Sequence, residues 1–139
     1  MRATFTVPGV PVPKKRPRVT RRGTFMPSHY TAWKERCRDE AGVVFAELED
    51  RGTPWDPHAS AYALTCWAYL PHSNGGDADG LAGSVMDALN EFAWADDRLV
   101  ADLRVVRRVD EDNPRMVVEA RVLSTVDLEA ALAAESEAA

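Results

Sequence analysis

The chain has 139 residues, 45% of them hydrophobic, which suits one domain and leaves no room for a second one of ordinary size. No apolar run approaches the ~20 residues that span a bilayer, and we expect no secretory signal at the N-terminus. The net charge of -5 argues against a nucleic-acid partner, but six of the 17 basic residues lie within residues 14–22, where there is no acidic residue.

The first predicted elements are a strand at residues 4–7 and a basic arm at residues 13–24. Between them, three prolines and a glycine at residues 8–13 interrupt any regular strand ladder. A local cationic segment is what contact with phosphates requires, whatever the net charge of the chain. A solvated basic loop is the alternative interpretation of this run taken alone.

A helix and a buried strand follow the arm. Apolar residues recur at helical spacing from residue 29 to about residue 50, with Ser28 available as the N-cap. Residues 59–70 are rich in aromatic and apolar side chains, which predicts a buried strand. Cys37 and Cys66 lack the spacing of a metal or redox motif, so we expect both to be reduced core residues of a cytosolic protein.

The second half of the chain predicts a loop, a helix and two strands. The Ser-Asn-Gly-Gly run at residues 73–76 indicates the loop, and apolar residues then share one face of a helix from about residue 81 to residue 92. Strands at residues 99–109 and 115–123 are separated by a short turn, so we expect them to form a hairpin. Residues 125–139 form an acidic, alanine-rich tail, either a frayed helix or disordered, to which we assign no function.

The order strand, arm, helix, strand, helix, strand, strand predicts a mixed α/β domain of the α+β class. Two main helices would pack on a small sheet of about four strands. We expect this domain to span residues 1–124, followed by the tail.

Four aspartates near the second helix are the candidate metal-binding groups. Asp77 and Asp79 are two residues apart, which in an extended segment places both carboxylates on the same side of the backbone. Such a pair suits Mg²⁺ or Mn²⁺ better than Zn²⁺, and a metal ion held there can activate a water molecule that attacks a phosphodiester. The alternatives are structural: Asp79 as a helix cap, Asp77 in an Asx turn, and Asp96 with Asp97 in an exposed turn.

Three runs around these aspartates resemble the signature of a known family. In chain order the runs are Asp77-Ala-Asp79, Asp87-Ala-Leu89 and Trp94-Ala-Asp96-Asp97. Their spacing and order are similar to those of RusA-type Holliday junction resolvases. Members of that family also open with a strand, a proline-containing turn and basic residues, as this chain does with Pro13-Lys14-Lys15-Arg16-Pro17-Arg18. The resemblance extends from about residue 4 to residue 123.

The resemblance implies a RusA-like homodimer that acts as an Mg²⁺-dependent endodeoxyribonuclease. Such enzymes recognise four-way DNA junctions and nick opposing strands in pairs during recombination and repair, in the cytoplasm of a bacterium, with a phage or prophage as a possible source. Asp77, Asp79 and Asp97 take the places of the catalytic, metal-binding acids, with Asp96 as a further metal ligand. Expected DNA contacts are the basic residues of the arm and the base beside the Asp doublet: Lys14, Lys15, Arg16, Arg18, Arg21, Arg22 and Arg98.

The chain departs from the family pattern at Gly80 and Gly83. Family members usually have Asn at the first position and a catalytic Lys at the second, and glycine supplies no charge for the transition-state phosphate. We hypothesise that another base takes this role: Lys14, Lys15, Arg16 or Arg98. The rival interpretation is a junction-binding protein with weakened or lost catalysis. A third interpretation, an acidic interaction module, does not explain the basic arm.

Chain geometry yields one further expectation, which concerns Asp97. The predicted helix carries the chain about 18 Å away from Asp77 and Asp79, at ~1.5 Å per residue. The five steps from Phe92 to Asp97 cover at most roughly 17 Å at ~3.3 Å each. We therefore expect Asp97 to meet Asp77 and Asp79 across a dimer interface rather than within one chain.

Overall fold

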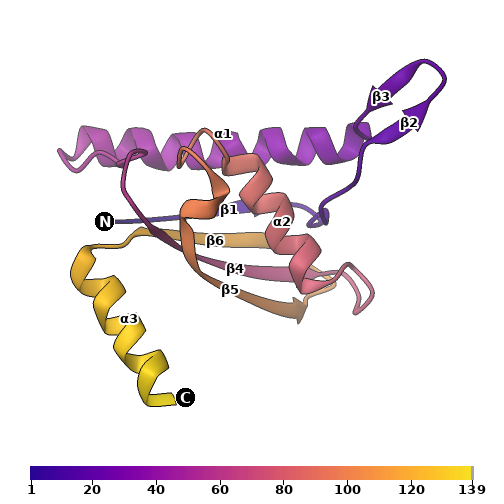
Figure 1. Cartoon of the computed structure of the whole chain (residues 1–139). Coiled ribbons are helices and arrows are strands. Elements are labelled where there is room, and N and C mark those ends of the chain that lie inside the picture. The colour runs from indigo at the N-terminus through magenta and orange to yellow at the C-terminus, as the bar shows by residue number, and fades with distance from the viewer. Residues whose placement is uncertain (139) are drawn as a thin grey trace.

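A four-stranded sheet forms the centre of the molecule. The computed structural model describes residues 1–138. The sheet contains β1 (Arg2–Pro8), β4 (Tyr62–Leu70), β5 (Val100–Val109) and β6 (Arg115–Val122), in the order β1-β6-β4-β5 (Figure 1). Strand β5 runs parallel to β4, and the other two pairings are antiparallel. The α+β class with about four strands and two main helices is thus confirmed.

The predicted hairpin between the last two strands is wrong, because β5 and β6 lie on opposite sides of β4. The turn at residues 110–114 passes the end of β4 and spans two strand spacings, or about 9.6 Å. Strand β4 is the most apolar of the three, with six of its nine residues buried, so it occupies the centre. Strand β5 carries one acid and three arginines among its ten residues, and charged side chains favour a sheet edge.

Two helices, α1 (Ser28–Asp50) and α2 (Ala78–Leu89), pack on the same side of the sheet (Figure 1). Ser28 is not the cap that the sequence suggested. Pro27 occupies the N-cap position of α1, no side chain caps the helix there, and Ser28 is its first helical residue. Helix α2 begins three residues earlier than predicted, and this shift places Asp79 in its first turn.

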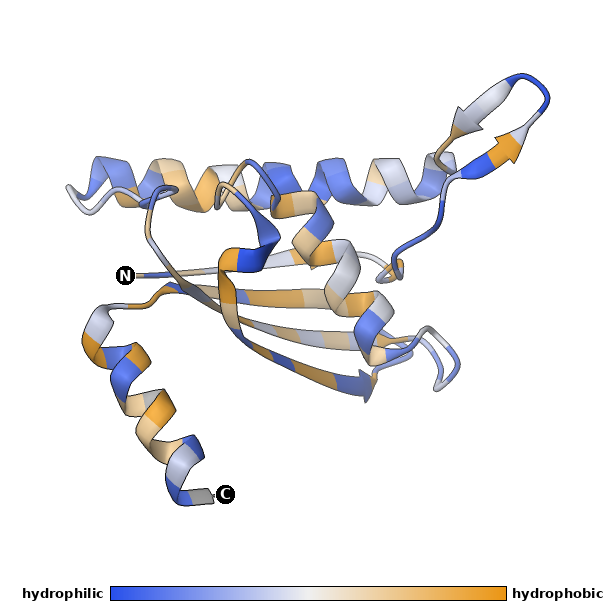
Figure 2. Cartoon of the chain, viewed as in Figure 1, coloured by the Kyte–Doolittle hydropathy of each residue, from blue (hydrophilic) through white to orange (hydrophobic). Residues whose placement is uncertain are grey.

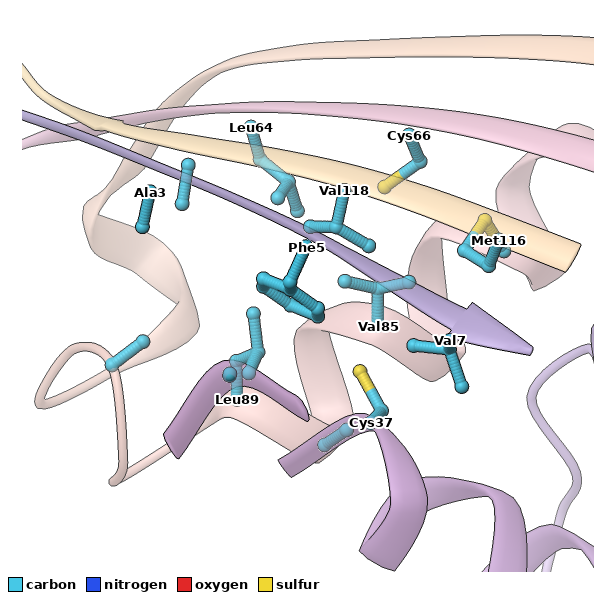
Figure 3. Packing of buried hydrophobic residues seen from close by; sticks show 14 of the residues in the cluster. Ala3, Phe5, Val7, Cys37, Leu64, Cys66, Val85, Leu89, Met116 and Val118 are labelled. Carbon is cyan, nitrogen blue, oxygen red and sulfur yellow. The ribbon is translucent and has the colours of Figure 1, made fainter. Parts of the chain in front are cut away.

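The core lies between the sheet and these helices. Alternate residues of β1 point into it, namely Ala3, Phe5 and Val7, as expected for a half-buried strand. Cys37 of α1 and Cys66 of β4 are buried there as free thiols, which confirms their predicted place in the core (Figure 3). Burial raises the pKa of both thiols, so each remains protonated and unreactive at neutral pH.

Two elements project from this body. The basic arm includes a two-stranded ribbon, β2 (Arg18–Thr20) paired with β3 (Gly23–Phe25), rather than a simple extended segment. All six strand residues are exposed, and Figure 2 shows mostly hydrophilic colour along the linker into the ribbon and at its tip. The tail forms helix α3 (Thr125–Ala138), whose Leu128 packs against a small cluster that contains Ala63 and Leu123.

Ala139, the last residue of the tail, lies outside the described residues. Over residues 1–138, no helix combines the length and the apolar character needed to cross a membrane.

Candidate functional site

Two acidic side chains, Asp77 and Asp79, stand at the start of α2. Asp77 is the N-cap residue, with extended backbone angles of φ -80° and ψ 155°, yet its carboxylate makes no capping hydrogen bond. Asp79 lies in the first helical turn, and both residues are exposed. Within residues 1–138 neither carboxylate accepts a hydrogen bond or joins an ion pair. The structural alternatives, an Asp79 cap and an Asp77 Asx turn, are therefore not what these side chains do.

The basic arm docks against the same end of α2. The backbone N–H of Lys14 donates to the carbonyl of Gly80 at 2.8 Å. A Cβ atom added to Gly80 would lie 3.2 Å from Pro13 Cβ, and one added to Gly83 would lie 3.2 Å from Lys14 Cδ. The two glycines that depart from the family pattern are thus the positions on which the arm rests.

An open cavity of about 520 Å³ lies between the arm and the helix. Carboxylates of α2 face cations of the arm across it, which makes it suitable for a phosphate flanked by a metal-binding group. Its lining residues are Lys14, Lys15, Arg16, Pro17, Met26, Asp79, Gly80 and Asp87.

Asp87, further along the same face of α2, is held by two partners from α1. Its Oδ2 accepts a 2.5 Å hydrogen bond from the Tyr30 hydroxyl and a 3.1 Å charged contact from Lys34 Nζ. Partial burial works against ionisation of Asp87, but these two hydrogen bonds and the charges of Lys34 and Lys14 outweigh it and lower the pKa of Asp87. The pKa of Tyr30 is raised by its burial and by the same carboxylate.

Asp97 begins the short 3-10 helix η1 (Asp97–Leu99) and is half-buried. Trp94, buried in the core, donates its indole N–H to Asp97 Oδ1 at 3.0 Å. Burial raises the pKa of Asp97, as do the nearby charges of Asp87 and Asp96, whereas the Trp94 hydrogen bond and Lys14 oppose the rise. The charges of Asp97 and of Asp87, in the last turn of α2, thus interact.

Asp96 and Arg98 have local roles in the isolated chain. Asp96 caps η1 by accepting the backbone N–H of Arg98 at 2.9 Å. The two side chains also form a 3.7 Å ion pair, in which Arg98 is 79% exposed. Arg98 does not line the cavity beside Asp79, unlike Lys14, Lys15 and Arg16.

These carboxylates fit a divalent metal ion by their chemistry but do not form a closed site. Over residues 1–138, no three acidic, histidine or cysteine side chains lie close enough to hold a metal ion together. A complete cage is not required, because Mg²⁺ often binds through one or two carboxylates together with waters and substrate phosphates. Asp77, Asp79 and Asp97 thus do not assemble within one chain, while their meeting across two subunits stays a prediction.

Residues 8–121 match the family model described as endodeoxyribonuclease RusA. The chain belongs to this family. The match covers most of the chain and includes the arm, α2 and the Asp96–Asp97 doublet, whereas α3 lies beyond it. No curated protein matches the chain at a significant level.

Membership in the RusA family makes the protein an endodeoxyribonuclease, which hydrolyses phosphodiester bonds in DNA, and implies the resolution of Holliday junctions. RusA-family nucleases generally depend on a divalent metal ion. The partner that such a resolvase implies is branched DNA, and the basic arm lies beside the acidic end of α2 in the way that phosphate contact would need.

In this RusA-family chain, the contacts of Tyr30 and Lys34 with Asp87 were not predicted from the sequence. One signal was available: Asp79, Gly83 and Asp87 are spaced by four residues and so share a helix face. Tyr30 and Lys34 have the same spacing in α1. Nothing in the sequence, however, indicated that these two faces would pack together.

Proposed function

We propose that this RusA-family protein is an Mg²⁺-dependent, homodimeric resolvase that cuts four-way DNA junctions by paired nicks in opposing strands. The observation that carries the proposal is a pair of carboxylates, Asp77 and Asp79, that no group within residues 1–138 engages. Asp79 also lines a cavity to which the arm contributes three cationic residues. Two exposed carboxylates that lack protein partners within residues 1–138 and stand two residues apart leave their oxygen atoms available to a hard cation such as Mg²⁺.

Asp77 and Asp79 would hold the Mg²⁺, and Asp97, with Asp96 as a further ligand, would complete the site. When bound, the ion polarises the phosphodiester and lowers the pKa of a bound water. In the hydrolysis a water oxygen forms a bond to phosphorus and one bond from phosphorus to a sugar oxygen breaks. That sugar oxygen takes up a proton, and the strand ends become a phosphate monoester and a hydroxyl. The Trp94 indole holds one oxygen of Asp97, which fixes the direction of the other.

The ribbon of β2 and β3 would bind the DNA backbone and position it at this site. It supplies Arg18 and, in its turn, Arg21 and Arg22, all exposed and without ion-pair partners within residues 1–138. Contacts of this type fix the position of the DNA without reading its sequence, in keeping with recognition of a junction by shape.

Replacing these three arginines tests the role of the ribbon. We expect Arg18→Ala/Arg21→Ala/Arg22→Ala to weaken junction binding and to reduce the slope of log K against log[salt] by about 0.9 for each phosphate that the variant no longer neutralises. Binding titrations at several salt concentrations measure both quantities. An unchanged slope would remove the ribbon from the interface.

The homodimer has a candidate surface on the side of the sheet opposite α1 and α2. Trp67 of β4 pairs in register with Val106 of β5 and Val117 of β6, which forms a half-buried apolar row across three strands. A second copy of the chain on this row would give two sites related by a two-fold axis, matched to the two-fold symmetry of a junction. Light scattering would then give about twice the 15.3 kDa of one chain.

The proposal is tested with a labelled, mobile four-way junction incubated with and without Mg²⁺. We expect nicked product only with Mg²⁺, and we expect Asp77→Asn to reduce the cleavage rate by at least about a hundredfold while junction binding persists. The rival interpretation, a junction-binding protein without catalysis, predicts binding but no product from the unaltered chain. An acidic interaction module would show neither binding nor product.

A further inference from the structure

The side chain of Lys14 packs against α2 at Gly83, which has no side chain of its own. An added Cβ there would stand 3.2 Å from Lys14 Cδ, 3.3 Å from its Cβ and 3.9 Å from its Cγ. The aliphatic stem of Lys14 therefore fills the space that a side chain at position 83 would take. Any larger residue at this position would have to displace the stem.

The backbone of the arm is fixed at the same place. Pro13 rests on Gly76 and Gly80, since Cβ atoms added to these glycines would lie 3.0 Å from Pro13 Cγ and 3.2 Å from Pro13 Cβ, respectively. The Lys14 N–H donates to the Gly80 carbonyl at 2.8 Å. Two consecutive arm residues thus dock on three glycines, which holds the Lys14 stem in its path along the helix.

The stem of Lys14 passes along a helix face that carries two acidic residues. Position 83 is one helical turn from Asp79 and one from Asp87, which are themselves about 12 Å apart along the axis. Lys14 lines the cavity together with both residues, and its charge acts on Asp87 and Asp97. Lys34 is already paired with Asp87, and Arg98 is paired with Asp96 outside the cavity.

We propose that Lys14 is the cationic catalytic residue of this site. Gly80 and Gly83 would then be small so that the arm can pack against α2 and place Lys14 beside its carboxylates. The inference rests on the proposed nuclease function. Lys14 would hold a non-bridging oxygen of the scissile phosphate and stabilise the charge that gathers there in the transition state. Lys15 and Arg16, the next residues of the arm, would bind neighbouring phosphates. The activity would then require the arm to be docked on α2.

Three variants separate these roles in single-turnover cleavage of the junction at saturating enzyme with Mg²⁺. Lys14→Met keeps the stem and removes the charge, and we expect the saturated rate to fall by about a hundredfold with less than a threefold change in Kd. Lys15→Met should act mainly on Kd. The double variant Lys14→Ala/Gly83→Lys removes the stem and places a lysine on the helix itself, and we expect it to recover at least a tenth of the unaltered rate. Arg51→Met, at the far end of α1, controls for removal of a surface cation.

The outcomes distinguish this inference from the proposed function. If the unaltered chain makes no nicks with Mg²⁺, the proposed function fails. If it nicks the junction, Asp77→Asn does not, and Lys14→Met cuts at the unaltered rate, only the role of Lys14 is overturned. An equal fall of the saturated rate in Lys14→Met and Lys15→Met would also overturn it, because general charge rather than position would then be responsible. Thermal unfolding of each variant verifies that it is folded.

Discussion

The two ends of the acidic face of α2 differ in how their carboxylates are satisfied. At the start of the helix, Asp77 and Asp79 are exposed, and within residues 1–138 no partner engages them. Two turns later, Asp87 is partly buried and bonded to Tyr30 and Lys34 of α1. The same residue type on one helix thus occurs in two different environments. The partnered carboxylate joins two helices, and the other pair is the one that we propose binds the metal ion.

The position of Lys14 between these two ends connects them. Its stem packs on Gly83, midway between Asp79 and Asp87. The arm docks on the backbone and glycines of α2, and Asp87 in turn bonds this helix to Tyr30 and Lys34 of α1. Variants that loosen the contact between the helices should therefore act first on stability, whereas variants at the start of α2 should act first on cleavage.

The largest effect on stability is expected from Asp87→Asn. This change removes the charge that Lys34 and Tyr30 satisfy, and hydrogen bonds to a charged group contribute about 1.5–3 kcal/mol. We expect the free energy of unfolding at pH 7, measured by urea denaturation, to fall by that amount. The matched control is Asp77→Asn, which should change it by less than about 0.5 kcal/mol because no group within residues 1–138 bonds to Asp77. If Asp87→Asn instead leaves stability intact and abolishes cleavage, Asp87 belongs with the metal ligands.

A smaller effect should appear as a pH dependence of the difference in the free energy of unfolding between the unaltered chain and Asp87→Asn. The pKa of Asp87 is lowered in the folded chain from its ordinary value of 3.8, so its ionised form is favoured by folding. The stability it contributes is complete above that ordinary value and is lost as the pH falls through the lower folded-state pKa. We expect the difference between the unaltered chain and Asp87→Asn to be constant from about pH 7 to pH 5 and to shrink below about pH 4. A difference that grows toward acid pH would mean that the pKa of Asp87 is raised rather than lowered.

Much of the fold was predictable from local patterns. The four sheet strands and the helices α1 and α2 follow from apolar spacing, and their bounds were predicted to within about three residues of those observed. The candidate catalytic aspartates and the arm were recognisable because their residue types and spacing are visible within short runs. Membership in the RusA family confirms the resemblance that these runs carried.

One prediction failed because two strands compete for the position next to β6 in the sheet. The short turn between β5 and β6 favoured a hairpin, but β4 is more apolar and takes the position between them. Capping by Ser28 failed for a local reason, since Pro27 with its restricted backbone already occupies the position before the helix. The ribbon within the arm was missed because three-residue strands carry almost no periodicity.

The sequence by itself determined which residues are candidates for metal and phosphate binding. Residue type and helical spacing are properties of a short run and do not depend on distant segments of the chain. Only the tertiary structure decided which of these candidates have partners. Asp87 is satisfied because α1 brings Tyr30 and Lys34 against α2, whereas at the start of that helix no donor within residues 1–138 reaches the carboxylates of Asp77 and Asp79. Lys14 and Gly83 are 69 positions apart in the sequence, and their contact exists only once the arm has folded back onto α2.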